Sequence, residues 1–165
     1  MNNLLAGLVK VLKVKFKRTC TKYNYYDGEN EKGERIIYIN EFNDLLVPAK
    51  LLWGRPTDAY FTESHEVGHA FFDAMDLSDD NGARRLFGDF SQEYRDEFGL
   101  LASIFHQPTG EYATKYASEH PLEDFADCFA FMVINHNFIP VWATNKKLRR
   151  KFEFIQKRIA KLNLI

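Results

Sequence analysis

Two histidines four residues apart mark the part of this chain best suited to chemistry, in the run His65-Glu66-Val67-Gly68-His69. Side chains at positions i and i+4 of an α-helix lie on one face about a turn apart, so both imidazoles can converge on one zinc ion. Glu66, beside the first histidine, is placed to act on a water bound to that ion. The simpler alternative is a helix that carries two histidines without a metal.

A catalytic zinc site normally has three protein ligands and one open position, so a third ligand must come from further along the chain. Six side chains are candidates: His106, His120, Glu123, Asp124, Asp127 and His136. We expect Glu123 to be the third ligand and Asp127, on the same helix face, to accept a hydrogen bond from a ligand histidine. Their helix is apolar nearly all round, and inward-facing acids there are costly unless paired or metal-bound. The alternative is that Glu123 and Asp124 only favour the helix N-terminus electrostatically.

These segments together resemble the gluzincin zinc metalloproteases, and in particular the group of the anthrax lethal factor catalytic domain and the Pro-Pro endopeptidases. In that group a Tyr lies seven residues before the ligand Glu, as Tyr116 lies before Glu123. The group's next segment is Phe-Ala-acid-x-Phe, which matches Phe125 to Phe129, and the run from Phe152 to Ile155 is also similar. The resemblance covers roughly residues 57–165.

The chain departs from that group in two places. The gap between His69 and Tyr116 is long, and Asp127 stands where relatives often have Glu. A second gluzincin group, the ImmA/IrrE-type regulatory proteases, resembles the chain in its Glu-x-x-Ala-acid-x-Phe-Ala helix but lacks this Tyr.

The resemblance implies a zincin-like domain that acts as a zinc-dependent endopeptidase. His65, His69 and Glu123 would hold Zn²⁺, and Glu66 would be the general base for a zinc-activated water. Tyr116 would stabilise the oxyanion, unless it only packs in the core. Two alternatives stay open: an ImmA/IrrE-like protease acting on one dedicated protein partner, and a non-catalytic zinc-binding module. A structural site has no need of Glu66, so its presence argues against the second alternative.

The sequence pattern also predicts the helices and strands that must position these residues. They make an α+β fold, mostly helical, with a small N-terminal β-sheet and the two histidines on a helix. Apolar periodicity, caps and turn residues predict five helices, at about 4–12, 57–75, 92–105, 121–135 and 145–162, and two strands, at 13–21 and 36–42. Asp27 to Gly33 is predicted to be a turn or loop. Gly68 is costly inside a helix and indicates that another element approaches there. A peptide substrate is expected to lie along a sheet edge, with 35–42 the candidate strand; a covered edge is the equal alternative.

Length and composition favour one domain, residues 1–165, with a substantial core. Of the 165 residues 45% are hydrophobic and 15% aromatic, which argues against long disorder. The net charge of −1 hides a segregated pattern. Residues 1–22 carry six Lys/Arg and no acid, residues 146–165 carry eight Lys/Arg and one Glu, and the stretch between them is strongly acidic. We interpret the basic ends as solvated faces of packed helices, with a membrane or nucleic-acid patch as the alternative.

The expected partners follow from the same counts. Apart from a protein or peptide substrate we expect no nucleic-acid partner, and we expect a monomer. No transmembrane segment is expected either, because no run of 18 apolar residues occurs. Lysines interrupt the apolar N-terminus, so no signal peptide is predicted. The chain has two cysteines, Cys20 and Cys128. They predict no disulfide scaffold, and Cys128 is expected to be a buried thiol, which favours a reducing, cytoplasmic compartment.

Overall fold

The computed structural model describes residues 3–19, 25–40, 59–90 and 110–162. Along the chain these form α1 (Asn3–Val11), β1 (Val14–Thr19), β2 (Tyr25–Glu29), β3 (Arg35–Asn40), α3 (Ala59–Ala74), the 3₁₀ turn η2 (Leu77–Asp79), α4 (Asn81–Phe87), the 3₁₀ turn η3 (Tyr116–Ser118), α7 (Pro121–Ile134) and α8 (Lys146–Ala160). The α+β class with a small N-terminal sheet is confirmed. The helix expected at 92–105 and the start of the one expected at 57 lie outside the described residues.

The sheet has three strands in the order β1-β3-β2. Strand β3 pairs in parallel with β1 and antiparallel with β2, so both of its edges are covered. Of the two alternatives left open for this strand, the covered edge holds for the described residues 35–40, and the described edge strands are β1 and β2.

Strand β2 lies where the sequence predicted the start of a turn. Its residues Tyr25 and Tyr26 pair with β3, but the register shifts before Glu29, and Gly28 has a φ of 89°. A glycine in that conformation inside a strand is typical of a bulge. The same Asp27-Gly28 pair that suggested a turn thus forms an irregularity within the strand.

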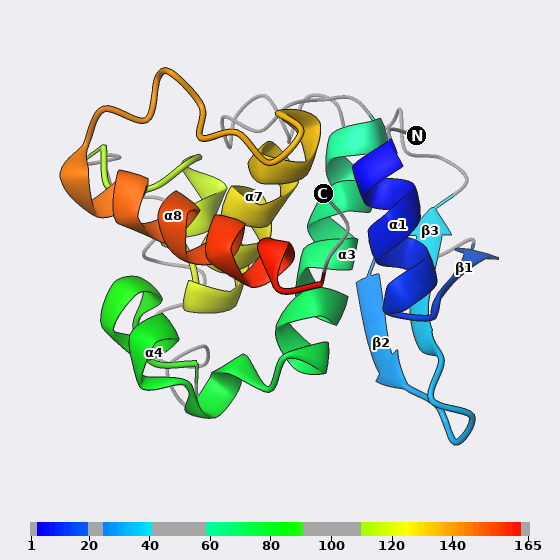
Figure 1. Cartoon of the computed structure of the whole chain (residues 1–165). Helices are drawn as coiled ribbons and strands as arrows, with labels where there is room; N and C mark the ends of the chain where they lie inside the picture. The colour runs from blue at the N-terminus through cyan, green and yellow to red at the C-terminus, as the bar shows by residue number, and fades with distance from the viewer. Residues whose placement is uncertain (1–2, 20–24, 41–58, 91–109, 163–165) are drawn as a thin grey trace.

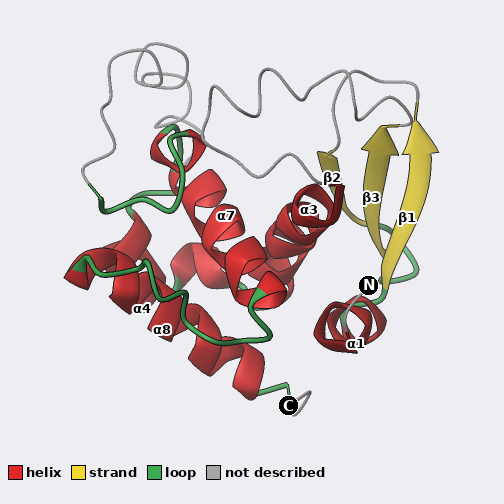
Figure 2. Ribbon diagram, turned by 90° about the horizontal axis from the view of Figure 1, so that it is seen from above, coloured by secondary structure: helices red, strands yellow, loops and turns green. Residues whose placement is uncertain are grey.

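Helix α3 lies between the sheet and helices α4, α7 and α8, whereas α1 lies on the sheet side (Figures 1 and 2). On one side it contacts β2 and β3, and on the other it packs against α7, with α4 and α8 beyond. Tyr26 of β2 donates a hydrogen bond of 2.7 Å to Asp73 near the end of α3. Phenylalanines from several helices fill the core: Phe71, Phe72, Phe87, Phe125 and Phe129.

Helices α3 and α7 approach each other closely at Gly68. A Cβ atom there would lie 3.0 Å from Cα of Ala126 and 3.2 Å from Cδ1 of Phe129. The close approach inferred from this glycine is confirmed. A larger residue would push the two helices apart, because backbone cannot move aside as a flexible side chain can.

The residues at the N-terminal ends of α7 and α8 explain where these helices begin. The side chain of His120 accepts a hydrogen bond from the N–H of Leu122, and Pro121 occupies the first turn of α7. Asn145 caps α8 in the same way. The apolar stripe predicted for α8 is buried at Leu148, Phe152, Ile155 and Ile159. Among the described residues no helix is long and apolar enough to cross a membrane.

Candidate metal centre

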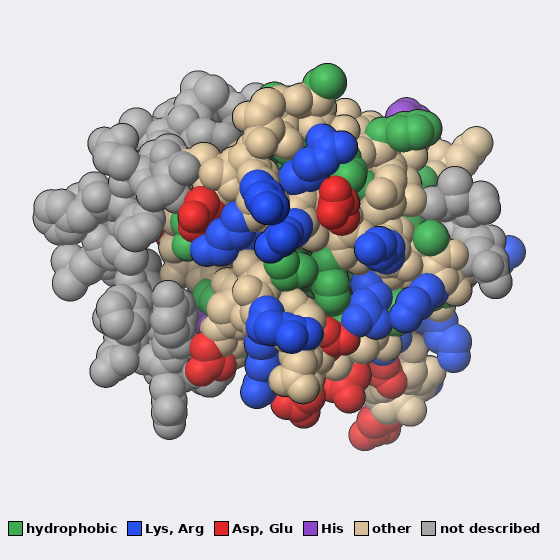
Figure 3. Space-filling view, turned by 60° about the vertical axis from the view of Figure 1, so that its left-hand side comes forward, with side chains coloured by type: hydrophobic (Ala, Val, Ile, Leu, Met, Phe, Trp, Pro, Cys, Tyr) green, Lys and Arg blue, Asp and Glu red, His purple; other side chains and the backbone are tan. Residues whose placement is uncertain are grey.

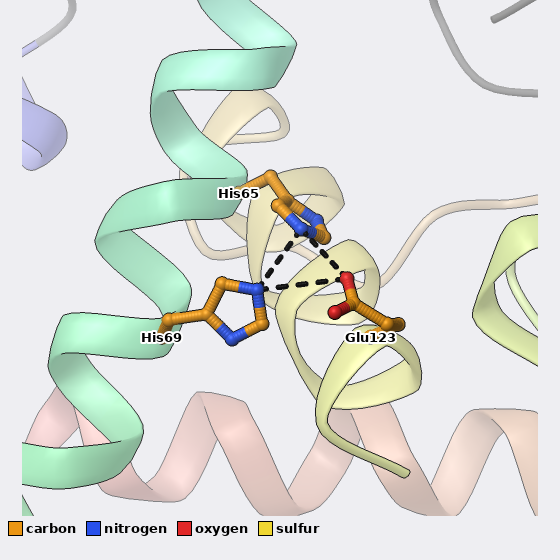
Figure 4. A group of neighbouring side chains, drawn as sticks. All are labelled: His65, His69 and Glu123. Atoms are coloured by element: carbon orange, nitrogen blue, oxygen red, sulfur yellow. Dashed lines mark hydrogen bonds and ion pairs between the residues drawn. The ribbon is translucent and has the colours of Figure 1, made fainter. Parts of the chain in front are cut away.

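The crossing of α3 and α7 brings two histidines and two acids to one place. At this crossing Gly68 of α3 meets Ala126 of α7. His65 lies three residues before Gly68 and His69 one residue after it. Glu123 and Asp127 have the same offsets from Ala126. Each pair therefore sits on the helix face that meets the other helix. Figure 4 shows the side chains of His65, His69 and Glu123 pointing toward one another from the two helices.

Three donor atoms converge between the helices. Nε2 of His65 lies 3.1 Å from Nε2 of His69 and 3.1 Å from Oε2 of Glu123. Nε2 of His69 lies 3.6 Å from the same oxygen. Nitrogen and oxygen ligands about 2.0–2.2 Å from a tetrahedral zinc are separated by about 3.3–3.6 Å. One of the three distances lies in this range and the other two are slightly shorter, so the three side chains form a group that could hold a metal ion after a small outward shift.

Asp127 determines which nitrogen of His65 faces that centre. Nδ1 of His65 lies 2.7 Å from Oδ1 of Asp127. An ionised carboxylate only accepts hydrogen bonds, so Nδ1 carries the proton and Nε2 turns its lone pair toward His69 and Glu123. With His65 in this tautomer, its Nε2 lone pair and the carboxylate of Glu123 repel each other at 3.1 Å unless a proton on His69 or a bound cation lies among them. The donor set therefore fits a cation, and a histidine backed by a carboxylate is a common arrangement around metals.

Thr114 connects this pair to the turn that holds Tyr116. Its hydroxyl donates a very short hydrogen bond to Oδ2 of Asp127 and accepts a 3.0 Å hydrogen bond from the N–H of Ala117 in η3. The ring of Tyr116 lies 6.1 Å from the ring of His65, centroid to centroid. The sequence gives no signal for Thr114, because no periodicity or spacing distinguishes it from other loop threonines.

Burial differs across the site. The side chain of His65 is 3% exposed and that of Glu123 9%, but that of His69 is 17% exposed, so His69 is the most solvent-accessible of the three. Burial raises the pKa of Glu123, but His69 and His65 outweigh it and hold that pKa well below its usual range. Glu123 is therefore ionised. Glu66 is also buried, and among the described residues no hydrogen bond or ion pair occupies its carboxylate.

Asp124, considered above as an alternative ligand, points elsewhere. Its Oδ2 lies 2.6 Å from Nζ of Lys151 on α8, and both side chains are almost fully buried. Burial raises the pKa of Asp124 to about 7, against the opposing effect of Lys151. Lys151 also donates to the backbone oxygen of Glu111. The sequence did carry a signal for Lys151, because it interrupts the apolar face of α8.

The remaining candidate ligands do not join this group. His120 is the cap of α7, and His136 is exposed after the end of that helix, with a φ of 53°. His106 lies outside the described residues. Cys128 is a buried free thiol, as expected, and burial raises its pKa well above the usual value, so it stays protonated.

Comparison with known proteins gives one match. A family model described as "Putative zinc-binding metallo-peptidase" matches residues 63–157, more than half of the chain. That span contains all four side chains at the crossing of α3 and α7. No curated protein and no solved structure matches the chain.

Proposed function

This chain belongs to that family of zinc-binding metallo-peptidases, and from this premise we propose that it is a zinc-dependent endopeptidase. His65, His69 and Glu123 would hold the ion, and Glu66 would be the general base. The observation that carries the proposal is the convergence of three donor atoms, 3.1–3.6 Å apart, with the proton of His65 directed away from them by Asp127.

When bound, zinc supplies a Lewis acid that acidifies water and polarises a peptide carbonyl. The protein's own groups do the rest. Glu66 accepts the proton of the attacking water on its carboxylate and delivers it to the leaving amine. Its burial, and the absence of a described partner for its carboxylate, support this role, because such a carboxylate is available to a water. Asp127 holds the proton on Nδ1 of His65 throughout.

Tyr116 is the proposed donor to the developing oxyanion. Its position beside His65 and its placement on η3, which is tied to Asp127 through Thr114, support this role. The set of His65, His69 and Glu123 supports a gluzincin of zincin-like fold. The spacing of Tyr116 to Glu123 favours the lethal factor and Pro-Pro endopeptidase group over other gluzincins.

Strand β2 is the proposed guide for the substrate, in place of β3. It is an edge strand, and it packs against the helix that carries the two histidines. An extended peptide can add to such an edge through backbone hydrogen bonds. A protease restricted to one protein partner would use the same site, and hydrolysis of that partner but of no general peptide library would favour this alternative.

Metal analysis combined with Glu66→Gln tests the proposal. We expect about one zinc per chain in both proteins, with kcat/KM for library peptides lower by about 10²- to 10⁴-fold in the variant. Glu63→Gln is the matched control, because Glu63 lies on the same helix and its pKa is raised by burial. Its activity should stay near that of the wild type.

Two results would refute the assignment. Carefully prepared protein that contains no zinc and recovers none on addition would exclude the metal site. Full activity in Glu66→Gln would exclude the base. Glu123→Ala should lose zinc retention, and an unchanged zinc affinity would remove Glu123 from the ligand set.

A further inference from the structure

The segment between α7 and α8 exposes three large apolar side chains within five residues. Val141 is 96% exposed, Phe138 71% and Trp142 48%. Single exposed apolar residues are common on soluble proteins, but a contiguous group of them marks an interaction surface. We call these three residues the apolar tip.

The backbone of this segment is fixed where it leaves α7. His136 and Asn137 both have positive φ, which reverses the chain direction. The N–H of Asn137 donates to the backbone oxygen of Met132, and its own oxygen accepts a 2.7 Å hydrogen bond from Gln156 on α8. The exposure of the tip is therefore built into the fold.

The other end of the segment is equally well anchored. A turn closes with a 3.0 Å hydrogen bond from the N–H of Ala143 to the oxygen of Pro140. The ring of Trp142 packs edge-on against Phe131 and Phe152, with centroids 5.0 and 5.8 Å away. One side of the indole is thus held in the protein while the other faces solvent.

A row of positive charges follows directly along α8. Lys146, Arg150, Lys157 and Lys161 are exposed, and at about 100° per residue they fall within about 60° of arc, opposite the buried stripe. Other cations of this helix are already paired with Glu111, Asp124, Glu153 and Asp80. We call the four exposed residues the basic face. Figure 3 shows Lys and Arg side chains gathered over the side of the molecule that carries α4 and α8.

The apolar tip and the basic face follow each other directly along the chain. Trp142 and Lys146 are four residues apart, which is at most about 14 Å of chain, and the turn at Pro140 shortens the span from Val141 further. From Phe138 to Lys161 the chain has eight Lys/Arg and a single Glu.

We propose that this surface docks the protein on an anionic lipid bilayer. The apolar tip enters the boundary between headgroups and acyl chains, and the basic face lies against acidic headgroups. A half-packed Trp suits that boundary, where its amphipathic ring is favoured.

Two features separate a bilayer from other partners. A stable protein interface buries about 1,200–2,000 Å² in total around an apolar core, and only three exposed apolar side chains are present on this surface, whereas a fluid bilayer needs no complementary shape. Single-stranded nucleic acid is bound by stacking on aromatic rings, but the most exposed residue here, Val141, is aliphatic. The docking is independent of the peptidase function, since none of these residues belongs to the metal centre.

Vesicle sedimentation with the full chain tests the proposal. The probes are vesicles of phosphatidylcholine alone and of phosphatidylcholine with roughly 30 mol% phosphatidylglycerol. We expect binding only to the anionic vesicles, weakening as salt rises. In a Trp53→Phe background Trp142 is the only Trp, and its emission should shift to the blue on binding.

Variants assign the binding to the surface. Phe138→Ser with Val141→Ser should weaken partitioning by about tenfold or more. The double variant Lys146→Glu with Arg150→Glu should weaken partitioning to anionic vesicles by about fivefold or more for each residue changed. Val11→Ser is the matched control, since Val11 is 47% exposed on α1 away from this surface, and it should bind as the wild type does.

Several outcomes would overturn the proposal. These are no binding to anionic vesicles, equal binding to both vesicle types, or unchanged binding in the tip variant. Dimerisation that depends on Phe138 and Val141, without vesicle binding, would identify the tip as a contact between copies of the chain. Binding of a single-stranded oligonucleotide without vesicle binding would assign the basic face to nucleic acid.

Discussion

Asp127 and Thr114 determine the chemistry of His65 without facing the centre themselves. Asp127 fixes the proton on Nδ1 of His65, and Thr114 holds the second oxygen of that carboxylate. The hydroxyl of Thr114 also accepts a hydrogen bond from the N–H of Ala117, which follows Tyr116 in η3. A single side chain outside the donor set thus connects the orientation of a histidine to the turn that carries the Tyr.

Replacing Thr114 tests this connection. Thr114→Val keeps the shape but removes the hydroxyl, leaving Asp127 and the N–H of Ala117 each without one partner. We expect a loss of about 1–3 kcal/mol in the free energy of unfolding and a zinc affinity lower by about tenfold. Chemical denaturation and competition with a chromophoric chelator measure the two quantities. Thr114→Ser, which retains the hydroxyl, should stay near wild type, and unchanged zinc affinity in Thr114→Val would contradict the connection.

At the scale of elements, the separation of α3 and α7 is set by the lack of a side chain at Gly68. The contact with Ala126 lets the helices approach until donor atoms on both reach a common centre. Both helices place the proposed site residues at the same offsets from this crossing. The donor atoms therefore meet because two conditions hold together: the residue spacing along each helix and the short distance between the two helices.

Gly68→Ala separates the two effects of this glycine. Helix propensity alone would stabilise the variant by about 1 kcal/mol. The added Cβ would lie 3.0 Å from backbone, which cannot yield locally, so we expect a net loss of about 1–3 kcal/mol in the free energy of unfolding and weaker zinc binding. Urea denaturation of the zinc-free protein gives the first quantity. A more stable variant with full zinc affinity would mean that the helices have room for a methyl group.

At the scale of the whole molecule, α8 packs against α7 and contacts its first turn. Lys151 reaches Asp124, the residue after Glu123, and the backbone oxygen of Glu111 on the segment that leads to η3. One buried ammonium therefore joins three parts of the chain around the metal centre. Asp124 is not available as a ligand in this arrangement, because its carboxylate is paired with Lys151 and points about 100° around the helix from Glu123.

Lys151→Met should destabilise the protein strongly. The variant leaves Asp124 buried without its cation, which typically costs about 3–5 kcal/mol. Adding Asp124→Asn removes the unpaired acid, so the double variant should recover a substantial part of the loss. Unfolding free energies of the two single variants and the double variant form a cycle that measures the coupling. Simple additivity would show that the pair contributes nothing as a pair.

The sequence by itself determined the local relations. The spacing of His65 and His69 placed both imidazoles on one helix face, Pro121 located the start of α7, and Gly68 indicated a close approach. These features could be predicted because they depend on the fixed rotation per residue of a helix and on the sterics of single residues. The choice of Glu123 over Asp124 rested on a family resemblance and on the cost of burial. It stays a prediction for which the geometry now supplies support.

Only the tertiary structure decided which elements meet. It gave Asp124 a partner 27 residues away, connected Thr114 to Asp127, and made β3 the central strand of the sheet rather than its edge. It also turned the Asp27-Gly28 pair, which resembles a turn, into a bulge inside β2. Contacts of this kind depend on how whole faces pack against each other. Periodicity along the chain fixes the direction in which each side chain points, but packing alone fixes what lies opposite.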